Sequence, residues 1–209
     1  MNYQLELEKT IDIVSKLEQK PTLLLHACCG PCSSYVLEYL NKYFDITILY
    51  YNPNIYPESE YYRRKDELKK FLTEFKLDST IKLVEDDYIP DEYYSAIKGQ
   101  EELGEKSKRC YTCYQLRLER AARYAKKYDF DYFTTTLSIS PYKISEWINE
   151  IGGNLEKEYN VKYLYADFKK KNGYKRSLEL SSEYGLYRQD YCGCKFSKEA
   201  RERQIKKGD

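Results

Sequence analysis

Residues 23–34 limit the fold of this chain more than any other stretch, because they join a leucine run to three cysteines: Leu-Leu-Leu-His-Ala-Cys-Cys-Gly-Pro-Cys-Ser-Ser. The leucines predict a short strand that is covered on both faces, as in a parallel sheet. Gly30 permits a tight turn, and Pro31 fits the first turn of a helix, where no N–H is needed. A helix N-terminus favours thiolate over thiol. We therefore expect this turn to be the centre of an active site.

Strand and helix patterns alternate along most of the chain. The predicted strands cover residues 22–26, 45–51, 81–84, 130–137 and 161–165. The predicted helices cover residues 2–19, 31–42, 58–76, a short segment after Pro90, 110–127, 143–158, 177–183 and a segment from about 197. This alternation indicates an α/β fold with a parallel sheet flanked by helices. We expect one domain over residues 1–209, with the α/β core at 22–165 and a C-terminal extension at 166–209.

Three predicted loops follow strands: the cysteine turn, residues 52–57 and residues 138–141. In parallel sheets, binding sites form beyond the C-terminal ends of the strands. We therefore expect the three loops to share one crevice.

Composition restricts the cellular setting. The net charge of +1 argues neither for nor against a nucleic-acid partner. The chain has no run of about eighteen apolar residues, so no membrane span is predicted. Its first residues include Glu6, Glu8 and Asp12 and contain no apolar signal core. We therefore expect a cytoplasmic protein without a membrane partner.

The seven cysteines fall into three close groups, which are Cys28, Cys29 and Cys32, then Cys110 and Cys113, then Cys192 and Cys194. Structural disulfides are rare in the cytoplasm. An isolated cysteine is usually an inert core residue, but three groups at these spacings indicate metal ligation or redox chemistry.

Cys110 and Cys113 have the spacing of a ligand pair, and with Cys28 and Cys29 they complete a set of four thiolates. Such a set suits structural zinc or an iron–sulfur cluster, and spacing alone does not separate the two. Adjacent cysteines are unlike the usual zinc spacing, which favours the cluster.

Cys192 and Cys194 are separated by Gly193 alone. A disulfide between them would close a small, strained ring, and strained disulfides are readily reduced. A redox pair is therefore favoured over two further metal ligands.

Two residues keep open roles. Cys32 is a further candidate ligand of the cluster or of a second metal ion, and it is equally compatible with packing. His26 is the single histidine, and it is compatible with proton donation or with a hydrogen-bonded structural role.

The segment 169–176 is a predicted basic loop with a glycine and a tyrosine. Such a loop suits a phosphate backbone and a stacked base, but it is equally compatible with a solvated surface. For the charged tail 206–209 we expect a solvated surface. The chain has no Walker loop, no G-x-G-x-x-G motif and no serine elbow.

Five ordered motifs closely resemble the QueH family of epoxyqueuosine reductases. They lie at residues 26–32, 51–55, 109–118, 133–143 and 187–194. The resemblance runs from about residue 23 to 194, and it implies a Rossmann-like fold of the adenine nucleotide α-hydrolase kind.

The resemblance also implies an activity, a cofactor and partners. The activity is the reductive removal of the epoxide oxygen from epoxyqueuosine at the wobble position of tRNA. The cofactor is a 4Fe–4S cluster held by Cys28, Cys29, Cys110 and Cys113. A redox-active disulfide joins Cys192 and Cys194. The partners are the tRNA that carries epoxyqueuosine and, as our own expectation, an external electron donor.

As a mechanistic hypothesis, the cluster binds or reduces the epoxide while the cysteine pair delivers or buffers electrons. An open iron position, with Cys32 or a second metal nearby, would act as a Lewis acid on the epoxide oxygen, and segment 169–176 would hold the anticodon stem-loop. The alternative is a zinc-stabilised tRNA-binding module without redox chemistry. A sulfur-transfer enzyme is a third interpretation, but residues 26–34 lack the Ser-Gly-Gly loop of the ATP-dependent enzymes.

Overall fold

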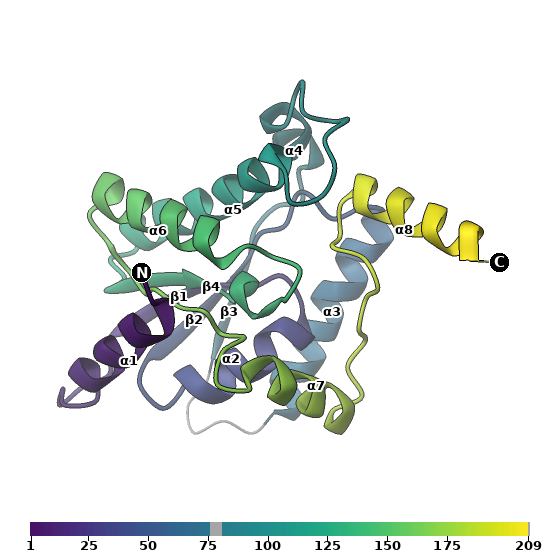
Figure 1. The fold of residues 1–209 in the computed structure, drawn as a ribbon. Helices are drawn as coiled ribbons and strands as arrows, with labels where there is room; N and C mark the ends of the chain where they lie inside the picture. The colour runs from purple at the N-terminus through teal and green to yellow at the C-terminus, as the bar shows by residue number, and fades with distance from the viewer. Residues whose placement is uncertain (76–80, 209) are drawn as a thin grey trace.

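The computed structural model describes residues 1–75 and 81–208, and its centre is a five-stranded parallel sheet (Figure 1). The strands are β1 Thr22–His26, β2 Asp45–Tyr50, β3 Lys82–Glu85, β4 Tyr132–Thr135 and β5 Lys162–Tyr163. Their order across the sheet is β3-β2-β1-β4-β5, and every pair is parallel. The predicted α/β fold class is confirmed.

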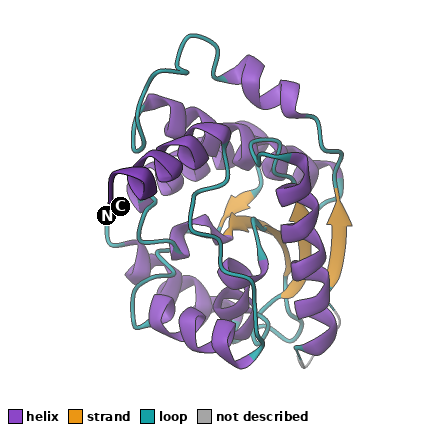
Figure 2. Ribbon diagram, turned by 90° about the vertical axis from the view of Figure 1, so that its right-hand side faces the viewer, coloured by secondary structure: helices purple, strands orange, loops and turns teal. Residues whose placement is uncertain are grey.

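Helices cover both faces of the sheet (Figure 2). They are α1 Tyr3–Val14, α2 Gly30–Leu40, α3 Glu58–Glu74, α4 Pro90–Ala96, α5 Lys108–Lys127, α6 Ser145–Tyr159, α7 Gly173–Glu183 and α8 Lys195–Gly208, with a 3₁₀ turn η1 at Thr136–Ile139. Leu23 and Leu25 of β1 pack with α1, α2, α3 and α7, whereas Leu24 packs with α5 and α6. The leucine run is therefore buried on both faces, as the sequence predicted.

The order of the strands reverses direction between β1 and β4. The chain winds outward from β1 to β2 and β3, and then returns to the other side of β1 to form β4 and β5. In open α/β sheets, ligands bind beyond the carboxyl ends of the strands at such a switch point. The cysteine turn follows β1 at this position.

Several element boundaries differ from the prediction. Helix α1 ends at Val14 rather than residue 19, where the exposed Leu17 has no core to cover. The strand predicted to reach residue 137 ends at Thr135, whose hydroxyl accepts the Leu137 N–H at 3.2 Å and starts η1. The predicted end of the helix 58–76 lies outside the described residues.

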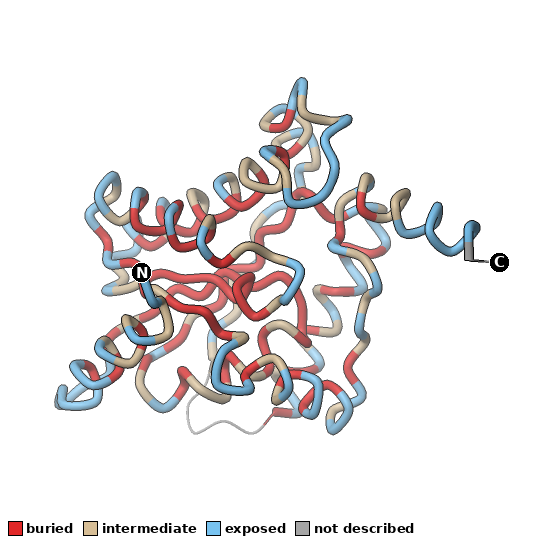
Figure 3. The backbone as a smooth tube through the Cα atoms, viewed as in Figure 1, coloured by how far each residue is buried: buried red, intermediate tan, exposed pale blue. Residues whose placement is uncertain are grey.

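The C-terminal segment first joins the core and then leaves it. Leu180 and Leu186 are buried with α2 and α3. Residues 187–194, here called the strap, then run to α8, which projects from the body (Figure 1). Figure 3 shows the buried sheet at the centre and the exposed end of α8. Within the described residues, no helix is both long and apolar enough to cross a membrane.

Candidate active site

The turn after β1 gathers three sulfur atoms. The Sγ atoms of Cys28, Cys29 and Cys32 all lie within 4.8 Å of one another, and those of Cys28 and Cys29 are 3.7 Å apart. This grouping follows from the local fold, because β1 ends at His26 and α2 begins at Gly30 with Cys29 as its N-cap. Within the described residues, no other three metal-ligating side chains lie this close together.

These three thiols favour one negative charge among them. Hydrogen bonds from the Cys29 and Cys32 thiols hold the pKa of Cys28 well below its usual range. Donating these hydrogen bonds to Cys28 raises the pKa of Cys29 to about 11, and it raises the pKa of Cys32 well above its usual value. The thiolate expected at this turn is therefore Cys28, and the main cause is its neighbouring thiols rather than the helix N-terminus.

The cysteine turn opens on a cavity of about 520 Å³ at the switch point of the sheet. The lining residues include Cys28, Cys32, Lys143, Gln189, Cys192 and Arg201. Cys28 Sγ lies 3.7 Å from the hydroxyl of Thr136, which follows β4. The cavity therefore sits between the ends of β1 and β4.

Two of the three loops expected to share a crevice line this cavity, and loop 52–57 contacts the cysteine turn without lining it. Asn52 donates a hydrogen bond to the carbonyl of Ala27 at 2.9 Å, which joins the second loop to the cysteine turn. Ser140 and Pro141 of the third loop line the cavity with Cys28.

Cys110 and Cys113 enter the same region from the first turns of α5. Cys113 is buried, and burial raises its pKa to about 12. Arg117 Nη1 lies 4.0 Å from Cys113 Sγ, and Arg117 Nη2 donates to Asn52 at 2.9 Å. The pair thus contacts the site through Arg117. It does not join the group of sulfurs within 4.8 Å, where the structure places Cys32 instead.

The strap holds Cys192 against α3 and Gly193 against the loop 52–57, while Cys194 packs with Tyr93, Ile97 and Cys113. Arg64 donates to the carbonyl of Cys192 at 3.3 Å, and the carbonyl of Gly193 accepts the N–H of Tyr56 at 2.8 Å. Gly193 has a φ of +130°, a conformation that side-chain-bearing residues rarely adopt. All seven cysteines are free thiols in the structure, including Cys192 and Cys194.

Three cationic side chains surround the sulfur atoms: Arg64, Arg117 and Lys143. Burial opposes their positive charge, but the ion pair with Glu60 raises the pKa of Arg64, and the negative charge of Cys28 raises that of Arg117. The sulfur atoms of Cys192, Cys28 and Cys32 likewise raise the pKa of Lys143 despite burial. All three therefore stay protonated and favour negative charge at the site.

Two of these cations retain an unused hydrogen-bond donor. Arg64 Nη2 and Arg117 Nε are buried and have no hydrogen-bond partner among the described residues. Buried donors are normally paired. Soft thiol ligands, buried cations and unpaired donors together fit a thiolate-bound metal or iron–sulfur centre, which carries negative charge.

His26 has a structural environment. It is fully buried, with Nε2 at 3.0 Å from the carbonyl of Tyr51 and Nδ1 at 2.9 Å from the hydroxyl of Thr135. The carbonyl requires Nε2 to donate, so Nδ1 accepts. Burial, followed by the charge of Arg117, lowers the His26 pKa to about 3, which keeps the ring neutral. Of its two roles left open by the sequence, this environment favours the hydrogen-bonded structural one.

The predicted basic loop is largely engaged within the molecule. Lys169 contacts Asp167 at 2.7 Å and the hydroxyl of Ser145, and Lys171 pairs with Glu8. Residues 173–176 are not a loop, because α7 begins at Gly173. Arg176 in this turn pairs with Glu38 at 2.6 Å. The predicted basic loop therefore ends at Asn172, and Lys169, Lys171 and Arg176 are paired, whereas Lys170 and Lys175 make no ion pair with a described residue.

Sequence reasoning gave no role to several residues of the site. Lys143 and Arg117 lie inside motifs, but their contact with cysteines depends on the fold. Gln189 donates to Cys29 Sγ at 3.1 Å across 160 positions of sequence. For Arg64 the sequence offers a faint signal, since Glu60 precedes it by four residues and pairs with it at 2.7 Å.

The fold and the site together define a doubly wound α/β protein with a thiol-rich centre at its switch point. A family profile described as epoxyqueuosine reductase QueH matches residues 23–200. The chain belongs to the QueH family.

Similar proteins from several bacteria agree with this assignment. A protein of Streptococcus pyogenes serotype M1 is 43% identical over 199 residues, which cover 94% of this chain and 78% of that protein. A protein of Staphylococcus epidermidis is 42% identical over 201 residues, covering 94% and 84%. A protein of Thermotoga maritima is 39% identical over 179 residues, covering 84% and 90%. Each is named epoxyqueuosine reductase QueH.

Proposed function

We propose that this chain is an epoxyqueuosine reductase that removes the epoxide oxygen from epoxyqueuosine at the wobble position of tRNA. Membership of the QueH family supports the activity. The observation that carries the proposal is the placement of the sulfur atoms. Cys28 and Cys32 line a cavity whose other wall holds Cys192, so a substrate in the cavity contacts both cysteine groups.

The proposed cofactor is a 4Fe–4S cluster held by Cys28, Cys29, Cys110 and Cys113. When bound, it supplies electrons to the cavity. The buried charges of Arg64 and Arg117 favour its anionic thiolate ligands. Cys32 has a separate proposed role as ligand of a second metal ion, because its sulfur lies with those of Cys28 and Cys29.

Cys192 and Cys194 are proposed as the redox pair. Removal of the epoxide oxygen as water leaves an alkene and consumes two electrons and two protons. A dithiol that closes to a disulfide releases two electrons and two protons, so the balance is complete for one turnover. An external donor must then return two electrons and two protons to reopen the disulfide. Gly193 between the cysteines lowers the backbone cost of that closure.

Lys143 is proposed to assist at the epoxide oxygen. Its ammonium group lines the cavity together with Cys28 and Cys32, and the negative charge of Cys28 favours its protonated form. It donates a hydrogen bond to the oxygen and stabilises the negative charge that develops as the C–O bond breaks. Tyr142, which is 73% exposed at the same cavity, offers a ring on which a neighbouring base stacks.

We also propose that the protein is located in the cytoplasm.

Metal analysis under anaerobic conditions tests the proposal first. We expect about four irons and four sulfides per chain, with a broad absorption band that bleaches on reduction. Turnover of epoxyqueuosine tRNA is then measured on the same preparation. Stoichiometric zinc without iron, persisting after anaerobic reconstitution, would instead support a zinc-stabilised tRNA-binding module.

A further inference from the structure

Helix α8 has one fixed end and one free end. At its start, Ser197 is buried; its hydroxyl donates to the carbonyl of Cys194 at 2.8 Å and accepts the N–H of Gly193 at 3.3 Å. From Arg201 to Lys207, every residue is exposed. The strap therefore sets the direction of α8, and its last two turns project into solvent (Figures 1 and 3).

One face of α8 continues the wall of the active-site cavity. Ser197, Ala200, Arg201 and Gln204 all line the cavity, and their spacing of three and four residues places them on one side of the helix. A ligand that extends out of the cavity past Gln204 therefore meets the last turns of α8.

The free end of α8 is strongly cationic. Residues 201–208 contain four cationic side chains and one acidic side chain. Arg201 pairs with Asp190 at 3.3 Å. Arg203, Lys206 and Lys207 make no ion pair with any residue that the structure describes. Residues 201–209 lie beyond the region matched by the family profile, which covers residues 23–200.

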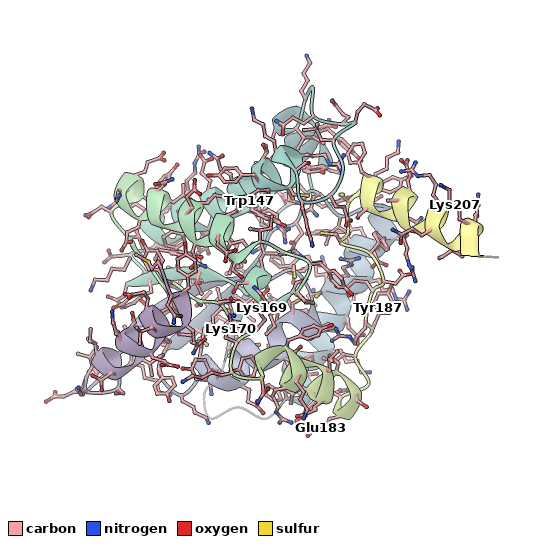
Figure 4. All side chains as sticks on the ribbon, viewed as in Figure 1. Trp147, Lys169, Lys170, Glu183, Tyr187 and Lys207 are labelled. Atoms are coloured by element: carbon pink, nitrogen blue, oxygen red, sulfur yellow. The ribbon has the colours of Figure 1, made fainter. Side chains whose placement is uncertain are left out.

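Segment 169–176 differs from the end of α8 because several of its cationic side chains are paired within the molecule. Lys169 is engaged by Asp167, and Arg176 is engaged by Glu38. Figure 4 shows Lys169 within the body of the molecule, whereas Lys207 stands at the outer end of α8. Arg188 lines the cavity without an ion pair to any described residue, and the free end of α8 adds unpaired cationic charge outside it.

We propose that Arg203, Lys206 and Lys207 bind the phosphate backbone of tRNA next to the nucleotide that enters the cavity. This inference rests on the proposed tRNA substrate. Phosphates are the ligands that a row of exposed lysine and arginine side chains recognises without regard to sequence. At about 1.5 Å per residue, α8 extends roughly 20 Å, which is long enough to follow several nucleotides.

The test is a variant that combines Arg203→Ala, Lys206→Ala and Lys207→Ala. Its affinity for an unmodified anticodon stem-loop RNA is measured at several salt concentrations. We expect affinity to fall roughly 10- to 100-fold at 0.1 M salt, and the slope of log K against log salt to decrease by about 2, since each phosphate contact on a single strand contributes about 0.7. With epoxyqueuosine tRNA and dithionite as reductant, the loss falls on KM rather than kcat.

A matched control removes three positive charges elsewhere. Lys126, Lys127 and Lys157 are exposed, and the first two end α5 at the opposite end from Cys110. If α8 contacts the RNA specifically, substituting these three lysines by alanine leaves the affinity for the RNA and its salt slope unchanged. An equal loss in this control, or unchanged affinity in the α8 variant of an active enzyme, overturns the inference alone. A wild-type protein that does not convert epoxyqueuosine tRNA overturns the proposed function as well.

Discussion

The two main cysteine groups of this protein are held in opposite ways. Cys28, Cys29 and Cys32 lie on a turn fixed by the central strand of the sheet and by α2, and the first two are buried. Cys192 and Cys194 lie on the strap, which has no regular secondary structure, and Cys192 is exposed.

This difference separates two chemical tasks. A rigid, buried turn keeps sulfur atoms at fixed distances, as a metal centre requires. A strap held by a few hydrogen bonds can approach an external reductant, and its thiols can move together to form a disulfide. We therefore expect substitutions in the turn to remove the cofactor, and substitutions in the strap to keep the cofactor but remove the two-electron supply.

The largest effect is expected for Cys28→Ser. Loss of a buried ligand removes bound iron and sulfide, and turnover falls by about 100-fold or more, beyond the effects typical of residues that only support ligands. Iron, sulfide and absorption are measured on anaerobically purified protein. Cys32→Ser is the matched variant in the same turn, and we expect it to keep four irons per cluster. Retention of the full cluster in Cys28→Ser would contradict the proposed ligand set.

Cys194→Ser sharpens the comparison from the side of the strap. The variant keeps its iron and sulfide because the turn is intact. It loses multiple turnovers, and pre-reduced enzyme yields less than one product per chain, since the single electron of a reduced cluster does not replace the two electrons of the dithiol. Product per enzyme is counted by mass analysis of the tRNA nucleosides. Sustained multiple turnover in either Cys192→Ser or Cys194→Ser would remove the dithiol from the mechanism.

Arg64→Leu tests how the strap is anchored. Arg64 is 2% exposed, pairs with Glu60 at 2.7 Å and donates to the carbonyl of Cys192. Its removal leaves a buried carboxylate without its partner, so the free energy of unfolding falls by about 3–5 kcal/mol. Urea unfolding of the apoprotein measures the change.

The control for Arg64 is an arginine in an exposed ion pair on a helix. Arg123→Ala breaks the pair with Glu119, and surface pairs of this kind contribute less than about 1 kcal/mol. Equal destabilisation by the two substitutions would show that the buried ion pair contributes no more to the free energy of unfolding than an exposed one.

Local sequence signals predicted the turn but not the strap. The leucine run, Gly30 and Pro31 lie within nine positions of one another, and each specifies its own backbone conformation. The contact between Arg64 and Cys192 joins residues 128 positions apart, and nothing near either residue indicates it.

The same distinction explains why the ion pairs of segment 169–176 could not be predicted. A run of basic residues looks available for phosphate when its partners are unknown. Glu8 and Glu38 engage Lys171 and Arg176 from α1 and α2, which lie far away in sequence. By contrast, the end of β4 had a local signal, because the Thr135 hydroxyl caps the following turn.

Gly193→Ala is expected to have the smallest effect, and it tests whether the strap depends on one backbone conformation. At a φ of +130° an alanine is strained, and its Cβ would lie 3.0 Å from Arg64 Nη1, the group that donates to Cys192. We expect a loss of about 1–3 kcal/mol in the free energy of unfolding.

Gly99→Ala, at a φ of +80° with no neighbour within 4 Å, isolates the backbone strain at about 1–2 kcal/mol. Gly104→Ala has neither strain nor contact, so its stability stays the same or rises slightly. If Gly193→Ala is no more destabilising than Gly99→Ala, the close contact with Arg64 contributes nothing, and the strap is held by its hydrogen bonds alone.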